Sequence, residues 1–316
     1  MGKIKVGVVG VGYLGQFHAE KYANMEGVEL VGVVDIDPSL AKEVAQRCRT
    51  QPFSRHSQLF DKVQAVSIAV PTLLHYPITK EFFLHGINAL VEKPVTRTLE
   101  EADDLIAIAE SKHLVFQVGH LERFNSAFTA SEDMAQNPLY IESHRLSPFP
   151  GRGADVNVIL DLMIHDIDIA LSLAKSKVKE VHAVGFPLLT SHSDIANAWI
   201  EFENGCIANL TASRISEEKT RKTLLVLPHG TLSVDFLVHK ASFSKRVTPP
   251  GKNQNSDLAT TEIPVVKADS LETEIHSFLE SVKERKETRV SGREARMALE
   301  VAHQIIQKID ERFAKK

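Results

Sequence analysis

The sequence has few cysteines and no long apolar run. Cys48 and Cys206 are its only cysteines, and they lack the C-x-x-C spacing of zinc or redox sites. This excludes a disulfide framework and favours a reducing, cytoplasmic location. No stretch approaches the roughly 18 uninterrupted apolar residues of a membrane span, so we expect no membrane association.

Positive charge is also not in excess. The 316 residues include 37 Lys and Arg against 41 Asp and Glu, a formal net charge of −4. Such a chain has no long-range positive field that would attract nucleic acid, so we expect no nucleic-acid binding. With 43% hydrophobic and 25% charged residues, the composition is that of a folded globular protein, and its length suffices for about two domains.

The first 120 residues alternate short apolar runs with amphipathic stretches. This pattern is typical of repeated βαβ units and therefore predicts an α/β fold with a parallel sheet. Helix starts are marked by Asp37 before Pro38 and by the capping pair Thr98 and Glu101. The expected strands are residues 4–9, 28–35, 65–70, 87–92 and 114–118.

After residue 121 the pattern changes to that of an open, mainly antiparallel sheet with helices. A helix is expected over about 156–173, and residues 247–264 are expected to form a mobile loop or lid. The division predicted is therefore a first domain, 1–120, and a second, 121–316. Its expected strands are 179–186, 194–202, 206–215, 222–227 and 231–244, and its last helices are about 270–287 and 293–313.

A glycine motif follows the first expected strand. Gly10, Gly12 and Gly15 have the G-x-G-x-x-G spacing. In this motif the first glycine allows a tight turn, the second lets a pyrophosphate approach the backbone, and the third lets helix and strand pack closely. The motif alone is a weak signal, but here it lies between a strand and a helix, as dinucleotide binding requires.

Asp35 strengthens this interpretation. It ends the second expected strand, 20 positions after Gly15, where a carboxylate accepts hydrogen bonds from the ribose hydroxyls of an adenosine. The alternative is a glycine-rich loop beside a solvent-facing aspartate. A negative Asp35, with no arginine next to it, repels a 2′-phosphate, so the sequence favours NAD over NADP.

Glu92-Lys93-Pro94 lies at the C-terminal end of another expected parallel strand, the edge at which open α/β sheets bind ligands. A lysine there can donate hydrogen bonds to a substrate oxygen and stabilise developing negative charge. The alternative is a surface lysine that caps a loop.

A second candidate for chemistry lies in the helix expected over 156–173. Asp161, His165 and Asp168 have the i, i+4, i+7 spacing of one helix face. A carboxylate one turn from a histidine fixes its tautomer and raises its basicity, as a general base requires. The alternatives are a core histidine and a metal site. The remaining histidines show no metal-ligand clustering; we expect His18, His75, His120 and His144 in loops or at the surface, without catalytic roles.

Together these motifs resemble the Gfo/Idh/MocA oxidoreductases. The glycine motif, the Glu-Lys-Pro element and Asp161 with His165 carry the resemblance, which covers essentially the whole chain. It implies a Rossmann domain followed by an α/β domain with an open antiparallel sheet. Residues 119–125, 145–153 and 212–222 resemble the bacterial nucleotide-sugar branch of this family.

The resemblance also implies a set of site residues. The expected catalytic residues are Lys93, Asp161 and His165. The expected cofactor-binding residues are Gly10, Gly12, Tyr13, Leu14, Gly15, Asp35, Pro71, Thr72, His75, Glu92 and Lys93. The expected substrate-binding residues are Lys93, Arg123, Asn125, Arg145, Arg152, Asp161 and His165, because guanidinium groups bind pyrophosphates bidentately; interdomain or surface salt bridges are the alternative for these arginines.

The implied activity is an NAD-dependent dehydrogenase of sugar hydroxyls, acting at C3 of a UDP-amino sugar such as UDP-N-acetylglucosamine, for lipid A or surface polysaccharide synthesis. A keto-sugar aminotransferase is the expected downstream partner, and no metal is expected. One alternative is a dehydrogenase of a free sugar or inositol, and another is a non-catalytic dinucleotide-sensing regulator. The resemblance implies self-association through the exposed sheet face, as a homodimer or homotetramer.

Overall fold

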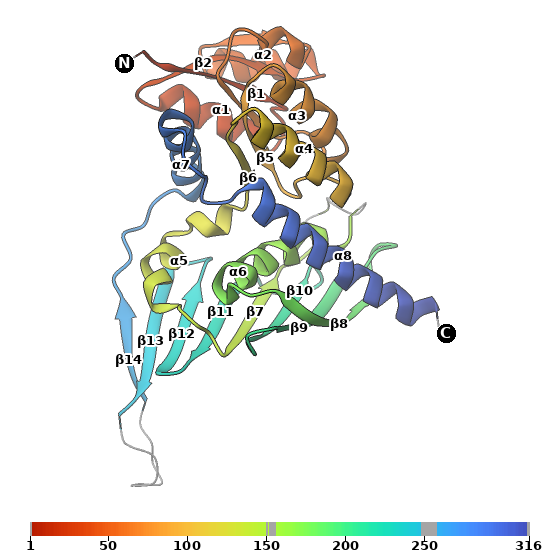
Figure 1. The fold of residues 1–316 in the computed structure, drawn as a ribbon, viewed down its shortest axis with the longest axis vertical. Coiled ribbons are helices and arrows are strands. Elements are labelled where there is room, and N and C mark those ends of the chain that lie inside the picture. The colour runs from red at the N-terminus through yellow and green to blue at the C-terminus, as the bar shows by residue number, and fades with distance from the viewer. Residues whose placement is uncertain (1, 150, 152–155, 248–257, 315–316) are drawn as a thin grey trace. The chain divides into compact units, whose positions relative to one another are not determined.

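The computed structural model describes residues 2–149, 151, 156–247 and 258–314. The chain forms two units (Figure 1). The first unit contains Met1–Leu121 and Ser270–Met297, and the second contains Glu122–Asp269 and Ala298–Lys316. The predicted first domain, residues 1–120, does not include Ser270–Met297, which belongs to the first unit.

The first unit has a six-stranded sheet in the order β3-β2-β1-β4-β5-β6. All neighbouring strands are parallel, which confirms the predicted class of sheet. The short β3, which contains Pro52, was not predicted. The strands are β1 (Ile4–Val9), β2 (Val28–Val34), β3 (Gln51–Phe53), β4 (Ala65–Ile68), β5 (Asn88–Glu92) and β6 (Phe116–Gly119).

Helices cover both faces of this sheet, with α1 and α2 packed together and α3 and α4 packed together (Figure 1). The predicted caps are present: the Asp37 carboxylate accepts hydrogen bonds from the amides of Ser39 and Leu40, and the Thr98 hydroxyl accepts one from Glu101. The helices of this unit are α1 (Gly15–Asn24), α2 (Pro38–Arg47), α3 (His75–Leu84), α4 (Leu99–Ser111), α7 (Ser270–Glu284) and the start of α8 (Gly292–Ala314).

The second unit has an eight-stranded sheet in the order β14-β13-β12-β11-β7-β10-β9-β8. Only β7 and β10 pair in parallel, so the sheet is mainly antiparallel, as predicted. The strands are β7 (Tyr140–Leu146), β8 (Val178–Phe186), β9 (Ile195–Phe202), β10 (Ile207–Ser213), β11 (Thr220–Leu227), β12 (Gly230–Asp235), β13 (Lys240–Arg246) and β14 (Leu258–Ile263).

Three expectations for this sheet were wrong. The central strand β7 was not predicted, because the residues that it buries include Ser143 and Arg145 as well as Ile141 and its sequence therefore lacks an apolar alternation. The run 231–244 divides into β12 and β13 at a turn. Within the expected loop 247–264, the described residues Leu258–Ile263 form edge strand β14, whose pairing with β13 is a long-range contact; residues 248–257 lie outside the described residues.

The helices α6 (Ile164–Ala174) and α8 lie on the same face of this sheet (Figure 1). Their apolar residues share one core with inward-facing residues of the strands. The helix expected over 156–173 begins with a π-helical turn, Ile159–Met163, before α6. Hydrophobic periodicity predicts a helix but does not distinguish this wider turn. Within this unit, the short α5 is Ser126–Ser131.

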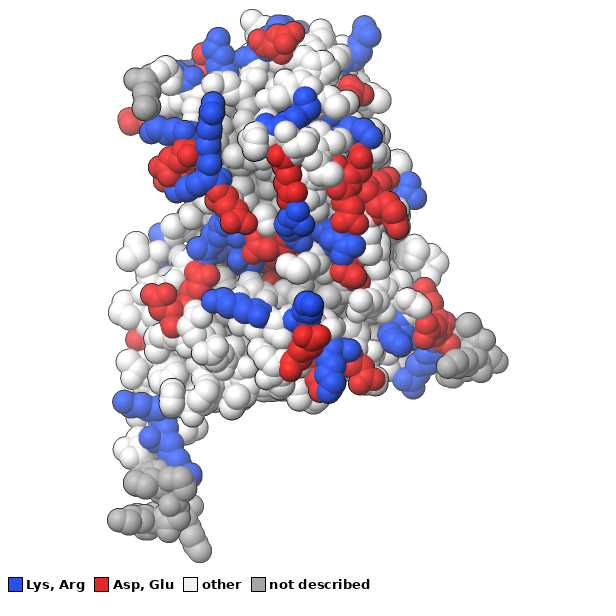
Figure 2. Space-filling model, in the orientation of Figure 1, with Lys and Arg blue, Asp and Glu red and all other residues white. Residues whose placement is uncertain are grey.

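On the face shown in Figure 2, positive and negative side chains are interspersed. Ion pairs in the first unit include Arg293 with Glu110 and Arg296 with Asp103. None of the helices in the described part of the chain is long and apolar enough to span a bilayer.

Candidate active site

The glycine motif forms the turn between β1 and α1. Gly10 has a φ of +82°, and a Cβ atom there would lie 2.7 Å from the carbonyl oxygen of Ala69. A Cβ atom on Gly15 would overlap the carbonyl oxygen of Gly10. A Cβ atom on Gly12 would meet no atom within 4 Å, so the backbone is open to a ligand at this position. This is the cradle that a pyrophosphate needs.

The N-terminus of α1 favours an anion. Its first turn contains no acidic residue, and the side chain of the preceding Leu14 makes no capping hydrogen bond. The amides of Gln16 and Phe17 donate to the carbonyl oxygens of Gly12 and Leu14, so the attraction for a phosphate comes from the positive end of the helix dipole. Tyr13 and Leu14 are exposed, at 61% and 43%.

Asp35 lies beside this turn at the end of β2. One of its carboxylate oxygens accepts a hydrogen bond from the amide of Val11 at 2.9 Å, and the other accepts one from the amide of Asp37 at 2.9 Å. These bonds orient the carboxylate and tie the glycine loop to β2. The next residue, Ile36, is 96% exposed. The residues around Asp35 thus fit a dinucleotide whose adenosine ribose carries no 2′-phosphate.

His75 connects the ends of β4 and β5. Its Nδ1 lies 2.9 Å from the carbonyl oxygen of Pro94, and its Nε2 lies 2.9 Å from that of Val70. Burial lowers the pKa of His75. This side chain braces the segment that follows Lys93, while Pro71 and the 3-10 turn of Thr72 lie on the same edge of the sheet.

The expectation that the histidines lie in loops or at the surface was wrong for His18 and His75, which are buried in α1 and α3, whereas His120 lies in the loop after β6 and is buried there. His18 lies on the inner face of α1, with its Nδ1 3.1 Å from the Ser67 hydroxyl and its Nε2 3.1 Å from Glu92. Its spacing from the buried Tyr22, four residues later, is a helical signal that could have identified it.

Glu92 precedes Lys93 and is held in this buried network. Burial alone would raise the pKa of Glu92, but the hydrogen bond and charge of His18 outweigh it and lower the pKa. The Ser67 hydroxyl also contacts the Tyr22 hydroxyl at 2.8 Å. A charged Glu92 at the start of the Glu-Lys-Pro element therefore fixes the strand end from which Lys93 projects.

Glu274 of α7 lies in the same unit and is 1% exposed. Among the described residues, neither of its carboxyl oxygens has a hydrogen-bond partner. Burial, followed by the charge of Glu92, raises the pKa of Glu274 well above its usual range. No sequence pattern identifies this residue, because a glutamate on an amphipathic helix is ordinarily exposed.

In the second unit, Asp161 lies in the π-helical turn and His165 in the first turn of α6, both half-buried. The Asn157 side chain caps this helix by accepting hydrogen bonds from the amides of Ile159 and Leu160, each at 3.1 Å. π-helical turns occur frequently at functional sites. The two residues are thus presented by a capped, irregular helix start.

Asp168, expected on the same face as His165, is buried and lies 3.5 Å from Nη1 of Arg123. This ion pair holds α6 to the segment that precedes α5. Arg123 was expected to bind substrate, and the structure shows it paired within its own unit.

Arg145 has a similar position in β7. Its Nε lies 2.8 Å from Asp166, and its Nη1 lies 2.8 Å from Glu122. Burial opposes the positive charge, but Asp166 and Glu122 outweigh burial and raise the pKa of Arg145. These contacts place Arg145 between β7 and α6, in the ion pairs that were the alternative to substrate contact.

Asn125 and Arg152 complete the expected substrate set. The Asn125 amide donates a hydrogen bond to the carbonyl oxygen of Phe236 at 3.0 Å, and its oxygen accepts one from the amide of Ala127. Asn125 therefore caps α5. Arg152 lies outside the described residues.

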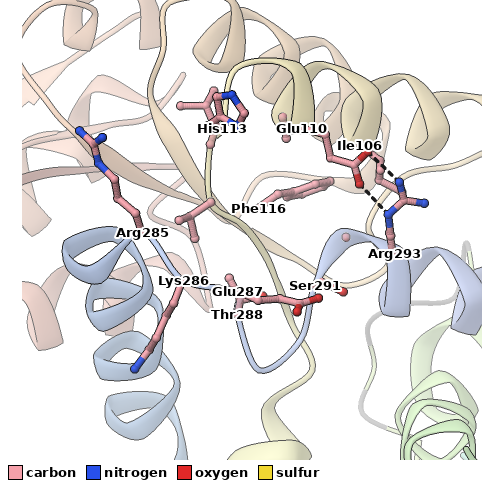
Figure 3. Close-up of a pocket in the computed structure, with 14 residues that line it drawn as sticks. Ile106, Glu110, His113, Phe116, Arg285, Lys286, Glu287, Thr288, Ser291 and Arg293 are labelled. Carbon is pink, nitrogen blue, oxygen red and sulfur yellow. Dashed lines mark hydrogen bonds and ion pairs between the residues drawn. The ribbon is translucent and has the colours of Figure 1, made fainter.

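The first unit also contains a pocket of about 340 Å³ (Figure 3). It is lined by residues of α4, β6 and the connection from α7 to α8, none of them in the expected site. The Arg293 guanidinium on its rim is paired with Glu110 at 2.6 Å. Within the described residues, no group of three or more His, Cys, Asp or Glu side chains could hold a metal ion.

The parallel sheet, the open glycine turn and Asp35 define a dinucleotide-binding oxidoreductase, and comparison with known proteins agrees. Residues 4–120 match the model of the oxidoreductase family with an NAD-binding Rossmann fold, and residues 117–233 match the GFO/IDH/MocA C-terminal domain. The chain belongs to the Gfo/Idh/MocA family.

Individual relatives extend this result. The chain is 37% identical over 309 residues to UDP-N-acetylglucosamine 3-dehydrogenase of Acidithiobacillus ferrooxidans, with 96% of each chain covered. A solved structure of that enzyme superimposes with a TM-score of 0.92, at 35% identity, over 98% of this chain and 99% of the other. Scyllo-inositol dehydrogenase of Lactobacillus casei, solved with NAD(H) and scyllo-inositol, has a TM-score of 0.80 at 17% identity over 98% of each chain, which shows a shared fold.

Proposed function

We propose that this dehydrogenase oxidises C3 of a UDP-amino sugar, UDP-N-acetylglucosamine, with NAD. The observation that carries the proposal is the 37% identity, over 96% of both chains, to an enzyme named for this reaction. It is supported by the positions of the three expected catalytic residues: Lys93 directly follows β5, Asp161 lies in the π-helical turn, and His165 lies in the first turn of α6.

In the proposed reaction His165 removes the proton of the sugar hydroxyl as general base. Asp161 orients His165 and stabilises the imidazolium that forms. Lys93 donates a hydrogen bond to the same oxygen and stabilises the developing alkoxide. NAD, when bound, supplies the hydride acceptor. The braces on Lys93, namely charged Glu92 and buried His75, hold its strand end in place.

We propose NAD rather than NADP as the cofactor. Val11 and Asp37 orient the Asp35 carboxylate, and no cation lies beside it in sequence to receive a 2′-phosphate. Arg123, Asn125 and Arg145 support the substrate site by holding α5 and α6, and Arg152 is the candidate for contact with the pyrophosphate.

We further propose a homodimer or homotetramer in the cytoplasm. The face of the eight-stranded sheet opposite α6 presents Trp199 and Leu224, which are exposed at 40% and 36%. Exposed apolar side chains on a sheet face are typical of an interface.

Both cysteines are buried and free, as is usual in a reducing compartment. The 3-keto product is the type of substrate that an aminotransferase consumes.

The test is NADH absorbance after mixing the protein with NAD and UDP-N-acetylglucosamine. A keto-sugar aminotransferase with glutamate pulls the equilibrium, and Lys93→Ala is the control. We expect NADH with the wild type and a large loss with the control. NADH from free sugars or inositol alone would contradict the UDP-sugar proposal, and tight NAD binding without any turnover would indicate a dinucleotide sensor.

A further inference from the structure

A second buried ion pair lies in the second unit, with partners other than those of Arg145. Arg214 follows β10, Asp194 precedes β9, and their side chains are 1% and 0% exposed. Nε of Arg214 lies 2.8 Å from Oδ1 of Asp194, and the amide of Arg214 donates a hydrogen bond to the Asp194 carbonyl oxygen at 2.9 Å. An ion pair this deeply buried costs desolvation energy, so what it holds in place is informative.

Asp194 fixes one side of this arrangement. Its Oδ2 accepts hydrogen bonds from the amides of Leu188, Leu189 and Thr190 at 2.7, 2.6 and 2.9 Å. Burial would raise the pKa of Asp194, but these amides and Arg214 lower it. The carboxylate is therefore charged and rigid, and its position sets the direction of the Arg214 guanidinium.

The guanidinium reaches the start of the helix that carries Asp161 and His165. Nη1 of Arg214 donates a hydrogen bond to the carbonyl oxygen of Val156 at 2.8 Å. Two residues later, the amide of Val158 donates to the carbonyl oxygen of Ser193, next to Asp194, at 2.9 Å. The backbone before Asn157 is thus held by Arg214, and the backbone after it is held by Ser193, the chain neighbour of Asp194.

Asn157 is the residue that caps this helix. Its side-chain oxygen accepts hydrogen bonds from the amides of Ile159 and Leu160, and its carbonyl oxygen accepts one from the amide of Asp161 at 3.1 Å. A displacement of Val156 therefore changes the position of Asp161 directly through the backbone. Errors of about 1 Å in catalytic groups reduce rates by about 10²-fold.

We propose that Arg214, held by Asp194, is a positioning residue that sets the helix start and so the Asp161–His165 pair. The kinetic part of this proposal rests on the proposed function, whereas the structural part does not. Arg214 acts on this helix start through its hydrogen bond to the carbonyl oxygen of Val156, which precedes the capping residue Asn157.

The test compares Arg214→Lys with Thr190→Val. Lysine keeps a charge opposite Asp194 but lacks the planar fork that also reaches Val156. Thr190→Val is the matched control, because it removes a hydroxyl that bonds both Asp194 and Arg214 and leaves the bond to Val156. The double variant Asp194→Asn/Arg214→Met removes both charges and replaces Arg214→Lys if that variant does not fold.

The first readout is hydrogen–deuterium exchange, which needs no substrate. For Arg214→Lys we expect the amides of residues 158–161 to exchange about tenfold faster, with β10 unchanged. An equal increase in β10 would mean general destabilisation and would overturn the proposal. Unchanged exchange at 158–161 would overturn it as well.

The second readout is steady-state kinetics with UDP-N-acetylglucosamine. We expect Arg214→Lys to lower kcat by about 10- to 100-fold with the KM for NAD unchanged, and Thr190→Val to keep kcat within about twofold. Equal losses in both variants would contradict the proposal. If the wild type is inactive with this substrate, the proposed function fails while the exchange result still decides the role of Arg214.

Discussion

Replacing Asp35 by asparagine removes one charge and keeps the size of the side chain. In the structure both carboxylate oxygens are used: one accepts the amide of Val11 and the other that of Asp37, each at 2.9 Å. Asparagine has one acceptor oxygen, so its NH₂ group must face one of these amides, which is repulsive. The variant therefore disturbs the glycine turn and also weakens the hydrogen bonds to the ribose hydroxyls.

The magnitude follows from the loss of one hydrogen bond to a charged acceptor. Such a bond contributes about 1.5 to 3 kcal/mol, so we expect the dissociation constant of NAD to rise about 10- to 150-fold. The affinity for NADP should fall less or rise, because the repulsion of a 2′-phosphate is removed. Ile36→Arg in the same chain should strengthen NADP further, since Ile36 is 96% exposed and the new side chain meets no obstacle.

The assay is calorimetric titration of the protein with NAD and with NADP. Asp37→Asn is the matched control: it removes the same charge two residues away, and asparagine keeps the helix cap that Asp37 provides to Ser39 and Leu40. We expect this control to bind NAD within about threefold of the wild type. An Asp35→Asn protein with wild-type affinity for NAD, or equal losses in both variants, would refute the role assigned to Asp35.

Three further predictions concern other residues of the two units. Gly15→Ala places a Cβ atom against the Gly10 carbonyl oxygen, so we expect NAD binding, followed by fluorescence, to be lost while circular dichroism still shows a folded chain. Arg145→Met leaves buried Asp166 and Glu122 without their cation, and unfolding in urea should show a loss of about 3 to 5 kcal/mol; an unchanged stability with a raised KM for the UDP-sugar would instead indicate direct substrate contact. Burial and Glu92 raise the pKa of Glu274, so the folded protein retains this proton above the pH at which the unfolded chain loses it. Stability from this group is full below the unfolded carboxyl range and falls as pH rises toward the folded pKa, by up to about 1.4 kcal/mol per pH unit. Glu274→Gln should remove this slope in urea titrations between pH 5 and 8, and identical slopes in the two proteins would show that Glu274 is ionised in the fold.

The sequence by itself determined the parallel sheet, the glycine turn and Asp35. These depend on local patterns: apolar runs of strand length, glycines where a side chain cannot fit, and a fixed spacing along one βαβ unit. The caps at Asp37 and Thr98 were predictable for the same reason, because a cap is a contact within four residues.

Tertiary structure alone decided which charged residues are buried and paired. Arg145 and Asp166 lie 21 positions apart, and Arg214 and Asp194 lie 20 apart, so their pairing depends on how strands and helices pack. The π-helical turn before His165 and the strand β7 were likewise not predictable, since periodicity does not record hydrogen-bond register or long-range pairing. The residue types therefore suggested substrate contacts for Arg123 and Arg145, whereas packing placed both against carboxylates of their own unit, because a buried guanidinium requires an anion close by.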